Sequence, residues 1–280
     1  IQEIFKLANE NLTNYTKQHP KFKVNITNLK KNVPHVSELF LGHVRYGTFG
    51  QNSKDAVHPF LRQNNWMHRN LIVAGNFNMT NNNQMFEDLV SLGQHTKEMS
   101  DTVTIMERIG HFLDDSVSKI YKKLKKEGVS KMDASAIIAE RIDLHKIIKK
   151  ASKDWDGGYV IGGLIGHGDA FVVRDQAGIR PAFFYKDDEV VVVASERPVI
   201  QTVFNTDFDE IKEINPGDCL IIKKSGKVFT KNVIESNLKK SCSFERIYFS
   251  RGSDKEIYKE RKKLGKLVFP QILESVDSDL

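Results

Sequence analysis

The stretch "DGGYVIGGLIGHGDAFVVRDQAGIRPAFFY", residues 156–185, decides the fold class of this chain. It holds three short runs rich in β-branched and aromatic residues, separated by the turn-like segments "GHGD" and "DQAGIRP". Connections this short join antiparallel neighbours, because parallel strands need a crossover of a dozen or more residues. The runs "EVVVVAS" (189–195) and "CLIIK" (219–223) extend the pattern. We therefore expect an antiparallel meander after Trp155.

Helical spacing of apolar residues dominates the chain before this meander. Helices followed by a block of strands favour an α+β fold over alternating βαβ units. Two short strands are expected earlier, at Ser37–Tyr46 and at Asn70–Ala74, the latter closed by Gly75. The predicted helices cover residues 1–16, 84–92, 101–127 and 130–149.

Bulk properties exclude several classes of protein. The 280 residues contain no apolar run long enough for a transmembrane helix, so we expect no membrane partner. The two cysteines cannot form a disulfide framework, which favours a reducing compartment, and we expect a cytoplasmic protein. The net charge of +6 comes largely from lysine-rich helical stretches without any nucleic-acid-binding motif. We therefore expect no nucleic acid as a partner and no metal-ligand cluster.

The stretch "LGHVRYGTFG", residues 41–50, places an arginine in a glycine-lined loop. The planar guanidinium of Arg45 suits the carboxylate of a small ligand, and Thr48 could add a hydroxyl to the same pocket. The alternative is a structural arginine paired with an internal acid.

Three further positions could complete a site for a free amino acid. Gly75 and Asn76 offer a close backbone approach and an oxyanion donor, or simply a strand-end turn. Asp101 could bind an α-ammonium if Ser100 caps the following helix, or could itself be the cap. His58, next to a proline, is by itself more typical of a packing or hydrogen-bonding residue. The turn that contains Arg174, Asp175 and Arg180 is expected to be structural.

Several motifs occur in the order found in amidophosphoribosyltransferases, and the chain resembles this family from about residue 37 onward. They are "GHVRYGTFG", "GNFNMTN", "SDTVTIMERIGH", the stretch quoted first, "VVVASERP" and "CSFERIYFSRGSD". The resemblance implies a class II glutamine amidotransferase with an N-terminal-nucleophile hydrolase fold, an αββα sandwich of two antiparallel sheets between helices. In such a protein an amino-terminal cysteine attacks the glutamine amide, with its own amine as base.

The resemblance also implies roles for individual residues. Arg45 would bind the glutamine α-carboxylate, Asp101 its α-ammonium, and Thr48 and His58 would line the site. The oxyanion hole falls on Gly75 or Asn76, depending on how "VAGNFNMTN" is aligned with the family pattern "HNGNLTN". The nucleophile has no counterpart, since neither Cys219 nor Cys242 lies at the required position.

The same resemblance implies an incomplete protein. Residues 1–238 would be a glutaminase domain without its N-terminal part, and residues 239–280 a linker and the first helix of a phosphoribosyltransferase domain. We expect this piece to be inactive alone. The whole enzyme would make phosphoribosylamine for purine biosynthesis from glutamine and phosphoribosyl diphosphate, with Mg²⁺ in the missing domain, as a homo-oligomer. Cys242 alone makes no iron–sulfur site, so no cluster is expected.

Two rival functions remain open at this point. Another class II amidotransferase, such as a glucosamine-phosphate synthase, would share the glutamine pocket. A non-catalytic glutamine sensor or assembly subunit would keep the pocket and lack the nucleophile by nature. A Cys-Gly start and a downstream phosphoribosyl-diphosphate loop in the full reading frame would separate these possibilities.

Overall fold

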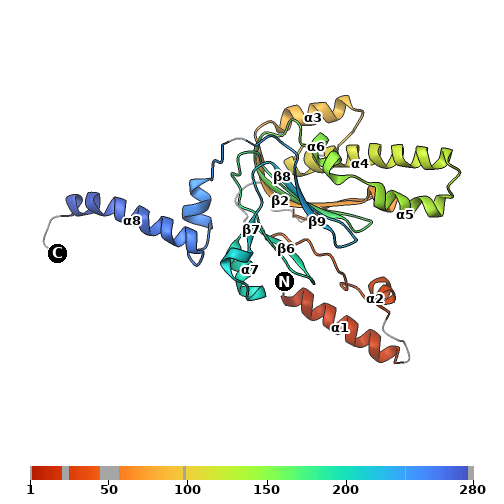
Figure 1. The fold of residues 1–280 in the computed structure, drawn as a ribbon, viewed down its shortest axis with the longest axis horizontal. Coiled ribbons are helices and arrows are strands. Elements are labelled where there is room, and N and C mark those ends of the chain that lie inside the picture. Colours follow the sequence, from red (N-terminus) through yellow and green to blue (C-terminus); the bar gives the residue numbers. More distant parts are fainter. Residues whose placement is uncertain (1, 21–24, 45–56, 97–98, 237, 277–280) are drawn as a thin grey trace. The chain divides into compact units, whose positions relative to one another are not determined.

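The chain folds into two compact units, which are described separately here (Figure 1). The first unit, residues 1–41, contains the helices α1 (Gln2–Gln18) and α2 (Ile26–Asn32). Asn25 caps α2, since its side-chain oxygen accepts a hydrogen bond from the Thr27 amide at 2.9 Å. The computed structural model describes residues 2–20, 25–44, 57–96, 99–236 and 238–276.

The strand predicted at Ser37–Tyr46 is wrong for its described part, because residues 37–44 form no strand. Phe40 instead lies beside Phe5 of α1, with 6.4 Å between the ring centroids. The apolar residues that suggested a strand thus make a local contact within the first unit.

A six-stranded antiparallel sheet forms the centre of the second unit, in the order β1-β2-β3-β4-β8-β9. The predicted meander is confirmed for the pair β3 and β4, and for the antiparallel pair formed by Phe183–Lys186 and Val191–Ala194. It is wrong between these pairs, because β4 pairs with β8 and the second pair belongs to another sheet. Strand β9 was not predicted. Among the described residues β1 and β9 are the edges of this sheet. Its strands are β1 (Phe60–Arg62), β2 (Leu71–Met79), β3 (Gly157–Ile165), β4 (Ala170–Arg174), β8 (Asp218–Ile222) and β9 (Val228–Asn232).

One face of this sheet is covered by helices. Ile105, Ile109 and Leu113 of the longest helix, α4, pack in one buried cluster with Val73 of β2 and Ile161 of β3. This cluster is the main hydrophobic core and its burial is the main driving force that holds helices and sheet together. The helices of this unit before β3 are α3 (Asn82–Ser91), α4 (Asp101–Lys126), α5 (Lys131–Arg141) and α6 (Leu144–Ala151).

A three-stranded antiparallel sheet covers the other face. Its strands are β6 (Val191–Ala194), β5 (Phe183–Lys186) and β7 (Lys212–Glu213), in that order. A second apolar cluster, with Ala182, Ile214 and Leu220 at its centre, packs between the sheets. Helix α7 (Arg197–Phe204) packs against β5, where the Phe204 and Tyr185 rings lie 5.8 Å apart. The layers are helix, sheet, sheet, helix, which confirms the predicted αββα sandwich.

The single helix predicted over residues 130–149 is wrong. The structure divides it into α5 and α6, with a break at Ile142 and Asp143. Ile142 is extended, and the Asp143 carboxylate caps α6 by accepting a hydrogen bond from the Lys146 amide at 3.2 Å. An aspartate competes well for such a cap, which explains why the apolar pattern continues while the helix does not.

The prediction that Gly75 closes a short strand is also wrong, because β2 continues to Met79. The glycine serves packing within the sheet. A Cβ at Gly75 would lie 2.3 Å from the Val160 carbonyl oxygen and 3.0 Å from the Ile161 Cα of the neighbouring strand. Only glycine fits this close approach of two backbones.

The C-terminal part of the chain is helical. A π-helical turn, η4 (Glu245–Phe249), precedes α8 (Lys255–Ser275), so the helix expected in this region is confirmed. Asp254 caps α8 through the amides of Glu256 and Ile257 at 2.8 and 3.2 Å. Within the ranges given above, no helix has the length and apolar character needed to cross a membrane.

Candidate functional site

His58 links the middle of β2 to the first turn of α4. Its Nδ1 accepts a hydrogen bond from the Gly75 amide at 3.3 Å, and its Nε2 lies 2.9 Å from the Thr102 hydroxyl. Since Nδ1 accepts, the neutral ring carries its proton on Nε2 and donates to Thr102 Oγ1. The ring also stacks on Phe77, with 5.5 Å between centroids. The structure thus brings His58 and Gly75 together at the start of α4.

Asp101 stands beside this link, at the N-terminus of α4. Of the two caps left open by the sequence, Ser100 is the cap of the helix, because its hydroxyl accepts from the Val103 amide. The Asp101 carboxylate has another partner, since Oδ2 accepts from the Met79 amide at 3.0 Å. Its other oxygen, Oδ1, accepts no hydrogen bond from residues placed by the structure. The carboxylate is therefore held at the end of β2 with one oxygen available for a cation.

Gly75 and Asn76 face opposite sides of the six-stranded sheet. Their directly opposed partners on β3 are Ile161 and Val160. Ile161 belongs to the core under the helices, whereas Val160 packs against the cluster between the sheets. Because opposed residues of antiparallel strands share a face, Asn76 points to the side of the smaller sheet. The two oxyanion candidates are thus not equivalent.

The Asn76 amide meets two charged side chains from distant segments. Its Nδ2 donates to Glu245 Oε1 at 3.4 Å, and Glu245 forms an ion pair with Arg180. Neither Arg180 nor Glu245 was assigned to the site from the sequence, although both lie in motifs that carry the family resemblance. The missing signal was their proximity to Asn76, which residue spacing does not reveal.

Arg45 and Thr48 lie outside the described residues. Their predicted contacts with glutamine stay predictions. His43, two positions before Arg45 in the sequence, lies beside His58, and the centroids of the two rings are 4.7 Å apart.

The turn after β4 has the structural role expected from the sequence. Asp175 is fully buried and accepts hydrogen bonds from the amides of Ala177, Ile179 and Arg180 at 2.9 to 3.1 Å. Arg174 is 2% exposed and pairs with Glu213 at 2.7 Å. Burial opposes ionisation of Glu213, but hydrogen bonds from Lys239 and Arg174 keep the pKa of this carboxyl below its usual range.

The cysteines give no nucleophile at this site. Cys219 lies in β8 within the main core, and burial raises the pKa of its thiol. A thiol that stays protonated is a poor nucleophile. Cys242 is half-buried, in the segment before η4. Over the described ranges no group of three His, Cys, Asp or Glu side chains is placed to hold a metal ion.

A buried polar cluster at the opposite end of β2 was not predicted. His68, in the short 3₁₀ turn η2 (Met67–Arg69) before β2, is 2% exposed and contacts the Ser135 hydroxyl at 2.9 Å. Its ring lies 5.4 Å from that of His167, which in turn contacts Asp169 at 3.0 Å. Asp169 also pairs with Lys223. This cluster joins η2, α5 and the β3–β4 turn, far along the strand from Asp101.

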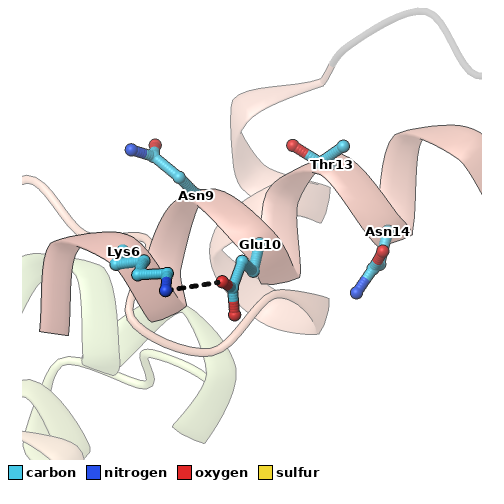
Figure 2. A pocket seen from close by; sticks show the side chains of 5 residues that line it. All are labelled: Lys6, Asn9, Glu10, Thr13 and Asn14. Atoms are coloured by element: carbon cyan, nitrogen blue, oxygen red, sulfur yellow. Dashed lines mark ion pairs between the residues drawn. The ribbon is translucent and has the colours of Figure 1, made fainter. Parts of the chain in front are cut away.

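A pocket of about 480 Å³ lies on α1 (Figure 2). Its lining comes from a single helix, and two of its side chains, Lys6 and Glu10, form an ion pair across one turn. The pocket belongs to the first unit, whereas the residues around β2 belong to the second. Its lining residues are Lys6, Asn9, Glu10, Thr13 and Asn14.

The fold agrees with the result of comparing the chain with known families. Residues 28–247 match the family model of the class-II glutamine amidotransferases, and the chain belongs to this family. Two of its relatives are the amidophosphoribosyltransferases of Bacillus subtilis (strain 168) and Escherichia coli (strain K12). The first is 29% identical over 241 residues, which are 81% of this chain and 42% of that protein. The second is 27% identical over 218 residues, 75% of this chain and 38% of that protein.

A solved structure gives the same result. The glutamine phosphoribosylpyrophosphate amidotransferase from B. subtilis, complexed with ADP and GMP, matches with a TM-score of 0.58 and 26% identity. The match covers 81% of this chain and 42% of that one. The chain thus spans about two fifths of the length of these relatives. The resemblance to amidophosphoribosyltransferases and the α+β fold class are confirmed.

Proposed function

We propose that this chain is the glutamine-binding part of an amidotransferase that makes phosphoribosylamine from phosphoribosyl diphosphate in purine biosynthesis. Membership of the class II family supports glutamine as the nitrogen donor. The names of the relatives support phosphoribosyl diphosphate as the acceptor. Because the chain spans only part of these relatives, the activity of the whole protein is our proposal.

The observation that carries the proposal is the position of the Asp101 carboxylate. It is anchored to the Met79 amide at the end of the strand that contains Gly75 and Asn76. A carboxylate with one oxygen held by the backbone is well placed to bind the α-ammonium of an amino acid through the other. The amide group of the same ligand would extend along β2 toward an oxyanion donor.

In this proposal each predicted residue has its own role in binding or reaction. Arg45 binds the α-carboxylate, Asp101 binds the α-ammonium, and Thr48 and His58 line the pocket. When a cysteine thiolate attacks the side-chain carbonyl, negative charge develops on its oxygen, and Gly75 or Asn76 stabilises that charge by donating a hydrogen bond. Ammonia leaves, and water then hydrolyses the resulting thioester to release glutamate. The ammonia displaces diphosphate from phosphoribosyl diphosphate and gives phosphoribosylamine.

Further parts of the proposal concern the whole protein. Mg²⁺ binds the diphosphate in a transferase domain, of which residues 239–280 are the predicted beginning. An iron–sulfur cluster is not part of the proposal. We also propose that the protein is a cytoplasmic homo-oligomer.

Isothermal titration calorimetry tests the proposal. It compares the affinity for L-glutamine of the 280-residue chain with that of its Asp101→Asn variant. The substitution keeps an oxygen for the Met79 amide but removes the charge that holds the ammonium. We expect the affinity for L-glutamine to fall by roughly 10- to 100-fold, the range for hydrogen bonds to charged groups. Asp115→Asn, on the exposed face of the same helix, is the matched control and should bind as the parent chain does. Equal affinity in all three proteins would refute the assignment of Asp101.

An assay of the full-length protein separates an enzyme from a glutamine sensor. With L-glutamine, phosphoribosyl diphosphate and Mg²⁺, the proposal requires release of glutamate and diphosphate in equal amounts. A protein that binds glutamine but releases neither product would be a sensor. One that releases glutamate without using phosphoribosyl diphosphate would be another class II amidotransferase.

A further inference from the structure

Glu245 is a buried carboxylate with two partners on different segments of the chain. It opens the π-helical turn η4 and is 7% exposed. One partner is the guanidinium of Arg180, in the turn between β4 and β5. The other is the Asn76 side chain on β2, whose Nδ2 donates to Glu245 Oε1 at 3.4 Å. Three segments distant in sequence therefore meet at one carboxylate.

The chemistry of the pair fixes which way the Asn76 amide lies. An ionised carboxylate only accepts hydrogen bonds, so it selects the amide orientation with Nδ2 toward it and Oδ1 away. The Nδ2 group carries two hydrogens, and Glu245 takes one of them. The second remains available as a donor to another oxygen.

Arg180 pairs with the carboxylate and holds it in place. A buried carboxylate is stable in its charged form only when it is paired. Arg180 is itself fixed at its backbone, since its amide donates to the fully buried Asp175 at 3.1 Å. The turn that appears only structural thus anchors an ion pair that reaches Asn76.

We propose that Glu245 is a positioning residue that orients the Asn76 amide as the oxyanion donor of the glutamine site, with Arg180 holding Glu245 in place. The proposal rests on the proposed function, because it assigns the donor role to the side chain of Asn76. It also decides between the two alignments of "VAGNFNMTN": the donor is the Asn76 amide, on the face toward the smaller sheet.

The substitution Glu245→Gln tests the orientation without any ligand. Glutamine offers both a donor and an acceptor, so the Asn76 amide loses its single preferred orientation. The side-chain amide resonances of Asn76, identified by their loss in Asn76→Ala, should shift in the ¹⁵N–¹H spectrum of Glu245→Gln. Glu140→Gln, at an exposed position on α5, is the control and should leave them unchanged. Unchanged Asn76 resonances in Glu245→Gln would overturn the proposal.

Glutamine binding provides the second measurement. We expect Glu245→Gln to weaken L-glutamine binding by about tenfold, as for loss of a charge-assisted hydrogen bond. The same change in the Asn76→Ala background should have no further effect, because Glu245 acts through Asn76. Arg180→Lys keeps a cation beside Glu245 and should retain most of the affinity. A purely structural Glu245 would give equal losses in both backgrounds, and that result would also overturn the proposal.

The two proposals fail in different ways. If the parent chain does not bind L-glutamine, the proposed function is refuted, while the Asn76 resonances still decide whether Glu245 orients the amide. If glutamine binds and Glu245→Gln only lowers the melting temperature, the function stands and the role of Glu245 is refuted.

Discussion

Single hydrogen bonds fix the residues around β2 over very different distances along the chain. The Ser100 hydroxyl caps α4 by accepting from the Val103 amide, while the Asp101 carboxylate accepts from the Met79 amide. The cap joins residues three positions apart, whereas the bond between Asp101 and Met79 joins residues 22 positions apart. The contact between Asn76 and Glu245 joins residues 169 positions apart and depends on the complete fold.

Gly75→Ala should destabilise the protein, because the new Cβ would lie 2.3 Å from the Val160 carbonyl oxygen and would push two central strands apart. We expect a loss of about 1–3 kcal/mol in the free energy of unfolding, the usual cost of overpacking. Urea denaturation followed by circular dichroism measures this loss. Gly265→Ala in α8, where no atom lies within 4 Å of the new Cβ, should instead leave stability unchanged or slightly raised. Equal stability of Gly75→Ala and the parent would contradict the tight strand approach.

At the scale of elements, the sequence identified most helices and strands but misplaced several ends. The apolar pattern was right about the core faces of α5 and α6, yet the cap at Asp143 divides them. Strand β2 was predicted too short, because a glycine within a strand has the same appearance in sequence as one at its end. The two residues of β7 and the three of β1 are too few for any periodic signal.

Arg197 connects three elements at the start of α8. This residue of α7 is 5% exposed and pairs with Asp254, the cap of α8, at 3.2 Å. Its guanidinium also lies 4.0 Å from the ring centroid of Phe208, in the 3₁₀ turn η3 (Phe208–Glu210). A buried cation with these partners holds the N-terminus of α8 on the sandwich.

Removing this cation should release α8. We expect Arg197→Met to cost about 3 kcal/mol, since Asp254 would remain buried without its counter-charge. Hydrogen exchange of the first amides of α8 measures the effect and should accelerate more than exchange in β3. Arg197→Lys retains the charge and should show a smaller effect. Exchange in α8 at the parent rate would show that Arg197 does not hold the helix.

For the whole molecule, the sequence predicted the layer order but not how buried polar groups join the layers. Hydrophobic periodicity and the order of helices and strands predicted the α+β class, whereas the four layers were implied by the family resemblance. Periodicity contains no information on partners such as His68 and His167, which come from separate segments and meet only in the folded state. In the site, the sequence left Ser100 and Asp101 as alternative caps, and it did not predict the contacts of Asp101 with Met79 or of Asn76 with Glu245.

This buried histidine pair should make stability depend on pH. Burial, followed by the nearby His167, lowers the pKa of His68 below its usual 6.5 in the folded state. Below that value the unfolded chain takes up protons more readily than the folded chain, so stability is full at higher pH and falls on acidification. On the His167 side, the cluster contains the carboxylate of Asp169, which forms an ion pair with Lys223.

His68→Gln removes one of the titrating groups in this cluster. The drop in melting temperature between about pH 7.5 and about pH 5.5 should therefore be smaller in the variant than in the parent. Thermal unfolding at several pH values measures the difference. His95→Gln, at an exposed position after α3, should keep the parental pH dependence. Identical pH profiles for His68→Gln and the parent would contradict the contribution of His68.

The edge strand β9 has a consequence for self-association. Lys231 within it and Lys227 just before it flank Phe229, with their ammonium groups 5.6 and 5.8 Å from its ring centroid. Positive charge along an open strand repels the same strand of another molecule and so protects against fibril-like stacking. If copies of this protein assemble, we expect their contact to lie away from β9.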